Sequence, residues 1–390
     1  MRNGSRIVIG LAFAAFLAGC KGFWDLPSST TTTTKTTLSS GVFYVLNQTT
    51  ETIAAYYISS GSLEEVSGSP YSLSAVPYSM AISPNGGFLY VGTASGVYLY
   101  TIGSSGALTI GNGGAVISSD IAAALQVSGS WLIDAYNPST GEVEVNAYSV
   151  SSSTGKYAGT TESQVFAVAN AAVEQMVLSP QDDYLFVALG TGGTIAVPFS
   201  TSNSSPLSST GKTIAVANSG GSALSVAVDP SERLLYIGET LANSSANSGG
   251  LRVINYSSLS GTLTQASGSP IASGGLAPHA ILPLASGSYV YVANGAGNTS
   301  TGKIESFTIS ASNSAYTVAA GSAITAGIQP MGLAEDNKDN FVLAVSSGGS
   351  TSSGNPDLEA YTMSSGTLTA AITSTTGTDP VGAVAVVALP

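Results

Sequence analysis

Short apolar runs separated by polar turns recur along the chain from residue 41 onward. In residues 76–100 (VPYSMAISPNGGFLYVGTASGVYLY), one apolar run ends at Pro84, a polar Asn-Gly-Gly turn follows, and a second run begins at Phe88. A third run ends in the aromatic residue Tyr100. Two apolar runs joined by such a turn predict a β-hairpin, and the third run adds another antiparallel strand.

The same unit appears seven times. Its second strand carries a short apolar motif, found at Phe43-Tyr44-Val45, Leu89-Tyr90-Val91, Leu132-Ile133-Asp134, Leu185-Phe186-Val187, Leu235-Tyr236-Ile237, Val290-Tyr291-Val292 and Val342-Leu343-Ala344. Its third strand ends in an aromatic residue, at Tyr56, Tyr100, Tyr148, Phe199, Tyr256, Phe307 and Tyr361. A Gly-x-Leu segment often follows and marks a fourth strand. Units of about fifty residues with four antiparallel strands predict an all-β, seven-bladed β-propeller.

The two ends of the chain complement each other. The first unit starts directly at its second strand, residues 42–46, with no first strand before it. The last unit is followed by residues 379–387 (DPVGAVAVV), which match the beginnings of other units. We therefore expect the C-terminal strand to complete blade 1 and close the ring without an exposed edge. The propeller is predicted over residues 41–390.

The first twenty residues have the pattern of an export signal. Arg2 and Arg6 precede an apolar segment, residues 7–16, which is too short to span a bilayer. The segment ends in Leu17-Ala18-Gly19-Cys20, which resembles the lipobox of bacterial lipoproteins. On this interpretation residues 1–20 are a lipoprotein signal segment, and Cys20 becomes the lipidated residue that anchors the protein to a membrane. A secretory signal with an incidental cysteine is the alternative.

Residues 21–40 contain a Ser/Thr tract (SSTTTTTKTTLSS) with nothing to bury, which predicts a flexible tether. Lys21 follows Cys20, so the inner-membrane retention signal of the enterobacterial kind, an Asp, is absent. We therefore expect an extracytoplasmic, membrane-anchored protein of the periplasm or the cell surface. If the cell has two membranes, the outer one is favoured. Cys20 is the only cysteine, so no disulfide is expected within the mature chain.

The composition narrows the range of partners. Only 10 of the 390 residues are Lys or Arg, and the net charge is -12. Phosphate binding needs a basic patch, so a nucleic-acid partner and strongly phosphorylated ligands are disfavoured. Apolar residues make up 43% of the chain and come in regular runs, which argues against disorder.

The repeat has the form P-x-x-h-A-h-S-P-x-G, where h is apolar, followed by h-Y-V. Residues 79–86 (SMAISPNG) and 175–182 (QMVLSPQD) carry it best, and residues 224–230 are close to it. This pattern resembles the YVTN-type and lactonase-type propellers, the 6-phosphogluconolactonase-like family, over residues 41–390. Propellers host many unrelated activities, so the resemblance specifies the fold more closely than the function.

The resemblance also implies a candidate catalytic site at the mouth of the channel. Lactonase-type relatives use a cluster of His, Glu and Arg there to polarise a lactone and activate water. Pro278-His279-Ala280 is similar to a segment of these relatives, and His279 is the only histidine. His279 is then the implied general base, with Glu239 or Glu174 orienting it. Relatives often have Asn-Glu after the Tyr-Val strand, whereas Asn294 is followed here by Gly295.

Tyr78, Asn294 and Arg252 are the candidate ligand-binding residues. Tyr78 is predicted to open an inner strand, Asn294 to close a second strand, and Arg252 to lie at the start of a third strand. No arginine falls at an obvious channel position, so an oxyanion would need backbone N–H donors.

The longest insertions also suggest a binding surface. Residues 240–250, 295–303 and 346–357 are rich in Ser, Asn and Gly and all join second to third strands. A polar rim formed by them would suit a glycan, a peptide or a protein, although drift in unconstrained loops explains them equally well.

No metal or cofactor is expected. One histidine and one modified cysteine cannot build a zinc site. Residues 336–340 and 181–183 resemble loose calcium loops, but they occupy the turn position of residues 84–86, so turn chemistry explains them.

The sequence leaves several functions open. We favour a lipid-anchored binding module of the cell envelope that acts through its channel face on an envelope protein, a peptide or a glycan, and we expect a monomer. The alternative is a lactonase-type hydrolase with His279 as general base, and a structural role within an envelope complex is a third possibility. Whether the protein is an enzyme stays open; if it is one, it is a lactone hydrolase. A sugar-phosphate lactone is disfavoured because basic residues are scarce.

Overall fold

The computed structural model describes residues 40–244, 248–257, 260–296, 301–312, 315–348, 356–374 and 380–390. The predicted signal segment, Cys20 and the tether up to residue 39 lie outside them. Ser40 already belongs to the folded unit Leu38–Pro390, because its hydroxyl accepts a hydrogen bond from the Ile58 amide (2.7 Å). Across these described stretches, no helix has the length and apolar character needed to cross a membrane.

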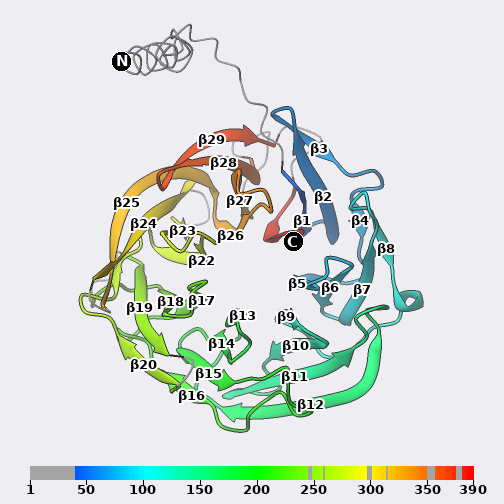
Figure 1. Cartoon of the computed structure of the whole chain (residues 1–390), viewed down its shortest axis with the longest axis horizontal. Helices are drawn as coiled ribbons and strands as arrows, with labels where there is room; N and C mark the ends of the chain where they lie inside the picture. Colours follow the sequence, from blue (N-terminus) through cyan, green and yellow to red (C-terminus); the bar gives the residue numbers. More distant parts are fainter. Residues whose placement is uncertain are drawn as a thin grey trace, which may run out of the picture. The chain divides into compact units, whose positions relative to one another are not determined.

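Within the described residues, the strands form seven antiparallel sheets that stand as blades around a central channel (Figure 1). The predicted all-β, seven-bladed propeller with four-stranded blades is therefore confirmed. Each blade is named below from its channel strand outward. Blades 1 and 5 have one extra short strand each, β4 (Tyr71–Ser72) on β2 and β21 (Ile271–Ala272) on β19.

The first half of the ring contains blades 1 to 4. Blade 1 consists of β30 (Ala383–Ala388), β1 (Val42–Asn47), β2 (Thr52–Ser59) and β3 (Ser62–Glu65). Blade 2 consists of β5 (Pro77–Ile82), β6 (Phe88–Thr93), β7 (Gly96–Ile102) and β8 (Leu108–Ile110), and a short 3-10 helix, η1 (Asn112–Gly114), follows it. Blade 3 consists of β9 (Ala124–Ser128), β10 (Trp131–Tyr136), β11 (Glu142–Val150) and β12 (Tyr157–Ala167). Blade 4 consists of β13 (Gln175–Leu178), β14 (Tyr184–Ala188), β15 (Thr194–Pro198) and β16 (Lys212–Ile214).

Blades 5 to 7 complete the ring. Blade 5 consists of β17 (Ala223–Val228), β18 (Leu234–Glu239), β19 (Gly250–Ser257) and β20 (Thr262–Gln265). Blade 6 consists of β22 (Ala277–Pro283), β23 (Tyr289–Gly295), β24 (Thr301–Ser312) and β25 (Ala315–Ile328). Blade 7 consists of β26 (Pro330–Glu335), β27 (Phe341–Ser346), β28 (Leu358–Ser364) and β29 (Thr367–Thr373).

The C-terminal strand closes the ring as predicted. β30 pairs antiparallel with β1, so that Val45 lies opposite Val386 and Phe43 opposite Ala388. Blade 1 is thus assembled from both ends of the described chain, and β1 has a hydrogen-bonded neighbour on each side. An unpaired β1 would present a free edge in the middle of the ring.

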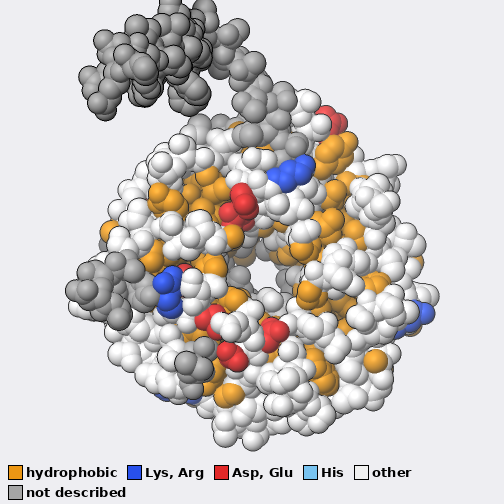
Figure 2. All heavy atoms as spheres, in the orientation of Figure 1, with side chains coloured by type: hydrophobic (Ala, Val, Ile, Leu, Met, Phe, Trp, Pro, Cys, Tyr) orange, Lys and Arg blue, Asp and Glu red, His pale blue; other side chains and the backbone are white. Residues whose placement is uncertain are grey.

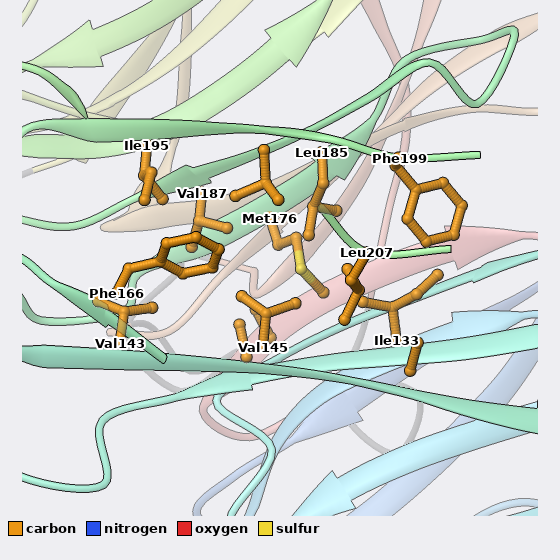
Figure 3. Close-up of a cluster of buried hydrophobic side chains, with 14 of the residues drawn as sticks. Ile133, Val143, Val145, Phe166, Met176, Leu185, Val187, Ile195, Phe199 and Leu207 are labelled. Atoms are coloured by element: carbon orange, nitrogen blue, oxygen red, sulfur yellow. The ribbon is translucent and has the colours of Figure 1, made fainter. Parts of the chain in front are cut away.

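The core lies between the blades rather than inside them. Because each blade packs against two neighbours, the second strands are buried on both faces, which explains why their motif is apolar throughout. Between blades 3 and 4, Ile133 and Val145 of one blade meet Met176, Leu185 and Val187 of the other (Figure 3). Burying these side chains supplies the apolar contact that holds neighbouring blades together.

Blade 3 breaks this apolar pattern at a single position. Asp134 is the third residue of the second-strand motif, where the other six blades have an apolar residue. Its side chain is fully buried, and one carboxylate oxygen accepts a hydrogen bond from Asn146 (3.1 Å). The other oxygen has no hydrogen-bond partner among the described residues. Burial, reinforced by the nearby carboxylate of Asp120, raises the pKa of Asp134 to about 7.

Asp134 should therefore make the folded state less stable as the pH rises. Its pKa is higher in the folded chain than in the unfolded chain, where it is near 3.8. The folded state therefore binds the proton more tightly between these values, and stability falls from about pH 4 to about pH 7. The shift in pKa corresponds to a loss on the order of 4 kcal/mol in the free energy of unfolding.

We expect Asp134→Asn to unfold at higher urea concentration than wild type at pH 8, and the advantage to shrink at pH 5. Exposed Glu64→Gln is the matched control, and an Asp134→Asn effect equal at both pH values would contradict the account.

Candidate functional site

A β-bulge at the head of the inner strands decides which side chains reach the channel. Between β22 and β23, Pro278 pairs with Asn294 and Ala280 with Ala293, so His279 is the extra residue. The same register shift leaves an extra residue in blades 1, 2, 5 and 7, namely Val384, Tyr78, Leu224 and Met331. Such a bulge interrupts the regular alternation of side chains in the strand pair and changes the direction of one of them.

Blades 3 and 4 present a residue at the same place. In blade 4, the Glu174 amide donates to the carbonyl oxygen of Ala188 (3.0 Å), and Ala188 also pairs with Gln175, so two residues face one. In blade 3, Ala123 precedes β9. From the points at which the repeats begin, the sequence predicts Ile121 and Val381 in this ring, each opening an inner strand. The structure places Ala123 and Val384 there, because the chain reaches the inner strand two or three residues later.

The seven bulge-position residues line one cavity of about 440 Å³ at the channel (Figure 2): Tyr78, Ala123, Glu174, Leu224, His279, Met331 and Val384. Deeper in the channel the wall includes the apolar residues Met80, Leu125, Met176, Ile281, Leu333 and Val386. Glu174 and His279 are the only titratable groups of this ring other than the Tyr78 phenol. The channel therefore combines apolar side chains with polar groups, among them one carboxylate and one imidazole.

The glutamine side chains of the channel are occupied in joining blades. Gln48 donates to the carbonyl oxygen of Pro77 (3.0 Å), and Gln126 donates to that of Met176 (2.9 Å). Gln175 accepts a hydrogen bond from the amide of Val226 (2.8 Å). Each bond crosses from one blade to the next. These amides fix the position of the bulge residues and have less capacity left for a ligand.

His279 is half-buried in the channel wall of blade 6. Its ring lies beside Gly295, where a β carbon would come within 3.4 Å of Cδ2 and Nε2. The imidazole makes no hydrogen bond to any residue that the structure describes. Burial lowers its pKa from the ordinary 6.5, so the ring is neutral at pH 7 and can both donate and accept a hydrogen bond.

Glu174 is exposed to the channel in blade 4, and partial desolvation by the channel walls raises its pKa. Blade 5 stands between Glu174 and His279, and no hydrogen bond joins the two side chains within the described chain. The structure therefore puts both residues in one cavity without bringing them into contact.

Glu239 lies inside blade 5 and is not part of the channel lining. Its carboxylate is 1% exposed and pairs with Arg252, whose Nη1 lies 3.1 Å from Oε1. The amide of Ala217 donates to both carboxylate oxygens, at 3.2 and 3.0 Å. Burial raises the pKa of Glu239, and these two donors act against that rise. Its partners among the described residues are Arg252 and Ala217, and no hydrogen bond joins it to His279, so Glu239 is not placed to orient His279.

Arg252 is held in the same cluster. Besides Glu239 it donates to the carbonyl oxygen of Ala215 (2.5 Å) and to the side chain of Gln265 (3.1 Å). Asn294 is likewise buried, and its amide accepts from the Ser273 hydroxyl (2.6 Å) and donates to the Ser273 carbonyl (2.6 Å). The hydrogen bonds of both side chains hold neighbouring loops against their blades. Of the three candidate ligand-binding residues, only Tyr78, which is 39% exposed, lines the cavity.

The turns that resemble calcium loops are explained by local bonding. Asp336 accepts hydrogen bonds from the amides of Lys338 (3.2 Å) and Asn340 (2.9 Å), as a turn aspartate does. Across the described ranges, no three His, Cys, Asp or Glu residues gather as they would around a metal ion.

Residues 245–247, 297–300 and 349–355, which make up much of the predicted polar rim, lie outside the described part of the chain.

Comparison with known proteins shows the fold and no family. No protein-family model matches the chain, and no curated protein matches it. A protein of Bacteroides fragilis NCTC 9343, provisionally named a 6-phosphogluconolactonase, is 14% identical with a TM-score of 0.68, covering 90% of this chain and 98% of that chain. A protein of Lactobacillus plantarum is 16% identical with a TM-score of 0.65, covering 90% and 99%. A functionally unknown protein of Desulfotomaculum acetoxidans DSM 771 is 13% identical with a TM-score of 0.65, covering 89% and 98%.

Because His279 is the only histidine, NMR can follow its imidazole directly. We expect its pKa to lie below 6.5, and Glu174→Gln to change that pKa by less than about 0.3, since a charge separated by a blade and by solvent acts weakly. A carboxylate in contact would instead raise it by about 1 or more. Glu162→Gln, on the outer strand β12, is the control. A pKa above 6.5 that falls in Glu174→Gln would show that the two side chains form a pair.

Proposed function

We propose that the protein is a lipid-anchored binding module of the cell envelope, whose channel mouth takes a small ligand or the end of a peptide or glycan. The observation that supports this most is the division of the candidate catalytic groups. Glu174 and His279 face the channel from blades 4 and 6 without touching, while Glu239 and Arg252 are paired with each other inside blade 5. A hydrolase would need such groups to converge on one reacting atom.

The side chains that line the cavity indicate which class of ligand fits it. Apolar side chains such as Leu224 and Met331 provide contact area, and neutral His279 and Glu174 provide hydrogen bonds. Among the described residues no Lys or Arg lines the cavity, and the net charge of the chain is -12, so an anion is disfavoured. A neutral or weakly cationic amphipathic ligand fits these features best.

The location of the protein is part of the proposal. Lipidation at Cys20 would anchor the propeller outside the cytoplasm, in the periplasm or at the cell surface, with residues 21–39 as the tether. A monomer presenting its channel face to envelope components is the simplest arrangement.

Lactone hydrolysis is the second candidate function. It is favoured by the neutral imidazole of His279 in the channel and by the fold shared with the B. fragilis protein. In such a reaction His279 would take a proton from water, and backbone N–H groups would have to stabilise the oxyanion. A phosphorylated lactone is opposed by the lack of cationic side chains in the cavity.

Hydrolysis and binding can be separated in one series of experiments. We expect wild-type protein to hydrolyse phosphorylated and unphosphorylated lactones no faster than His279→Ala. We also expect ligand-observed NMR to detect a neutral oligosaccharide or an uncharged short peptide that binds wild type. Leu224→Arg, which places a large side chain in the channel, should abolish that binding. His279→Ala should weaken it several-fold.

Two results would overturn this assignment. Lactone turnover that disappears in His279→Ala would make the protein a hydrolase. Binding that persists unchanged in Leu224→Arg would place the ligand outside the channel. Thermal melting of both variants checks that they fold.

The proposed anchor predicts where the protein is found in cells. Wild-type protein should incorporate radiolabelled palmitate and sediment with the membrane fraction, because acyl chains on Cys20 partition into lipid. Cys20→Ser should lose the label. Ser28→Ala, in the tether, is the control. Membrane-bound, labelled Cys20→Ser protein would contradict lipidation at this residue.

A further inference from the structure

A hydrogen bond between neighbouring blades recurs at the tyrosine of the second-strand motif. In blade 1 the hydroxyl of Tyr44 donates to the carbonyl oxygen of Gly106, in the turn between β7 and β8 (2.8 Å). In blade 2 the hydroxyl of Tyr90 donates in the same way to Gly155, in the turn between β11 and β12 (2.8 Å). Both tyrosines are buried, and the bond satisfies a hydroxyl that would be costly to bury alone.

This bond is missing between blades 6 and 7. Tyr291 is the motif tyrosine of β23, and Gly366 is the glycine of the turn between β28 and β29 in the next blade. The ring of Tyr289 packs directly against Gly366, so the two blades still touch here. The Tyr291 side chain is 0% exposed, yet its hydroxyl has no hydrogen-bond partner among the described residues. The motif tyrosine of blade 5, Tyr236, is also buried with a hydroxyl that has no partner among the described residues, but of the two only Tyr291 lines the cavity described next. A buried unpaired hydroxyl beside a cavity indicates that a ligand there can supply the missing partner.

A cavity of about 470 Å³ occupies this place, and its volume lies in the range of small-molecule sites. Its lining includes Tyr289, Tyr291, Glu335, Asp339, Met363 and Gly366. It is formed by the turns that follow β22, β26 and β28, whereas the channel mouth is formed by the segments that precede the inner strands. The cavity therefore lies on the opposite face of the ring from the channel mouth.

The charge of this cavity is negative. Glu335 and Asp339 line it, and its lining contains no Lys, Arg or His. One oxygen of Glu335 accepts a hydrogen bond from the amide of Ala285 (2.9 Å). Burial raises the pKa of Glu335, and the carboxylates of Asp339 and Asp336 add to that rise, while the Ala285 amide opposes it. A bound cation would relieve both the desolvation and the repulsion between carboxylates.

We propose that this cavity binds a small organic ammonium ion with an apolar or aromatic body. Glu335 and Asp339 neutralise the ammonium group, and the Tyr291 hydroxyl accepts one of its N–H bonds. The rings of Tyr289 and Tyr291 and the thioether of Met363 surround the body of the ligand, and aromatic rings also favour a cation. An anion would be repelled. A bare metal ion lacks the three ligand side chains that would hold it in the described part of the protein.

Benzylammonium is the probe, measured by isothermal titration calorimetry with the purified full-length protein at pH 7.5. We expect saturable binding to wild type, and binding of the neutral isostere benzyl alcohol to be weaker by about tenfold or more. Glu335→Gln keeps the shape of the side chain and should reduce affinity about tenfold, and Asp339→Asn should also reduce it. Tyr291→Phe should reduce affinity several-fold without lowering the melting temperature, since its hydroxyl makes no bond to lose.

Matched controls separate this cavity from the rest of the ring. Tyr44→Phe removes the equivalent hydroxyl where it is bonded, so it should lower the melting temperature but leave benzylammonium affinity unchanged. Leu224→Arg, which plugs the channel, should also leave it unchanged, so failure of the channel proposal and failure of this one are distinguishable. The proposal is overturned by the absence of saturable binding up to about 10 mM. It is equally overturned by affinity that survives both Glu335→Gln and Asp339→Asn, or by affinity that is lost in Leu224→Arg.

Discussion

The register shift at the head of the inner strands, present in five of the seven blades, is the constraint on which the channel depends. A regular antiparallel pair would alternate its side chains between the two neighbouring blades and leave few of them facing the axis. In blades 1, 2, 5, 6 and 7 a bulge inserts one residue that is free of this alternation. Ala123 and Glu174 take the same place in blades 3 and 4, and the seven residues together form the ring around the cavity. The inter-blade hydrogen bonds of Gln48, Gln126 and Gln175 then hold these positions in place. The fold thus places one side chain of this ring in each blade, and Glu174 and His279 are its only titratable groups apart from the Tyr78 phenol.

The propeller fold also places the few charged side chains of the protein in separate environments. Glu239 and Arg252 compensate each other within blade 5, where an unpaired charge would be costly to bury. Asp134 has no cationic partner in the part of the chain that the structure describes, so burial favours its protonated form. Glu174 and His279 remain available in the channel, and Glu335 and Asp339 remain available on the other face. Two cavities of different character therefore lie on opposite faces of one ring: the channel mouth is lined by one carboxylate and one neutral imidazole, and the other cavity by two carboxylates.

The fold could be predicted from the sequence because the second strand of every blade is buried on both faces. Each second strand therefore needs a run of apolar residues, and this motif recurs seven times. Ring closure was predictable for the same reason, since residues 379–387 repeat the start of a blade. The site was predicted only in part. Pro278-His279-Ala280 predicts the bulge residue correctly, but no comparable motif precedes β9, so the sequence predicts Ile121 where the structure has Ala123.

Partners that lie far apart in the sequence could not be foreseen. Glu239 is bonded through the amide of Ala217 and through Arg252, and only the folded blade 5 shows that its carboxylate is occupied. Tyr291 lines the cavity of blades 6 and 7, and its hydroxyl has no hydrogen-bond partner among the described residues; no pattern in the sequence predicts this. Carboxyl footprinting of the native protein tests most directly whether Glu174 is accessible and Glu239 is buried and paired. The protein is treated with a carbodiimide and an amine, and the modified residues are identified by mass spectrometry. The account predicts early modification of Glu174 and protection of Glu239 until the protein unfolds; equal rates at these two residues would contradict it.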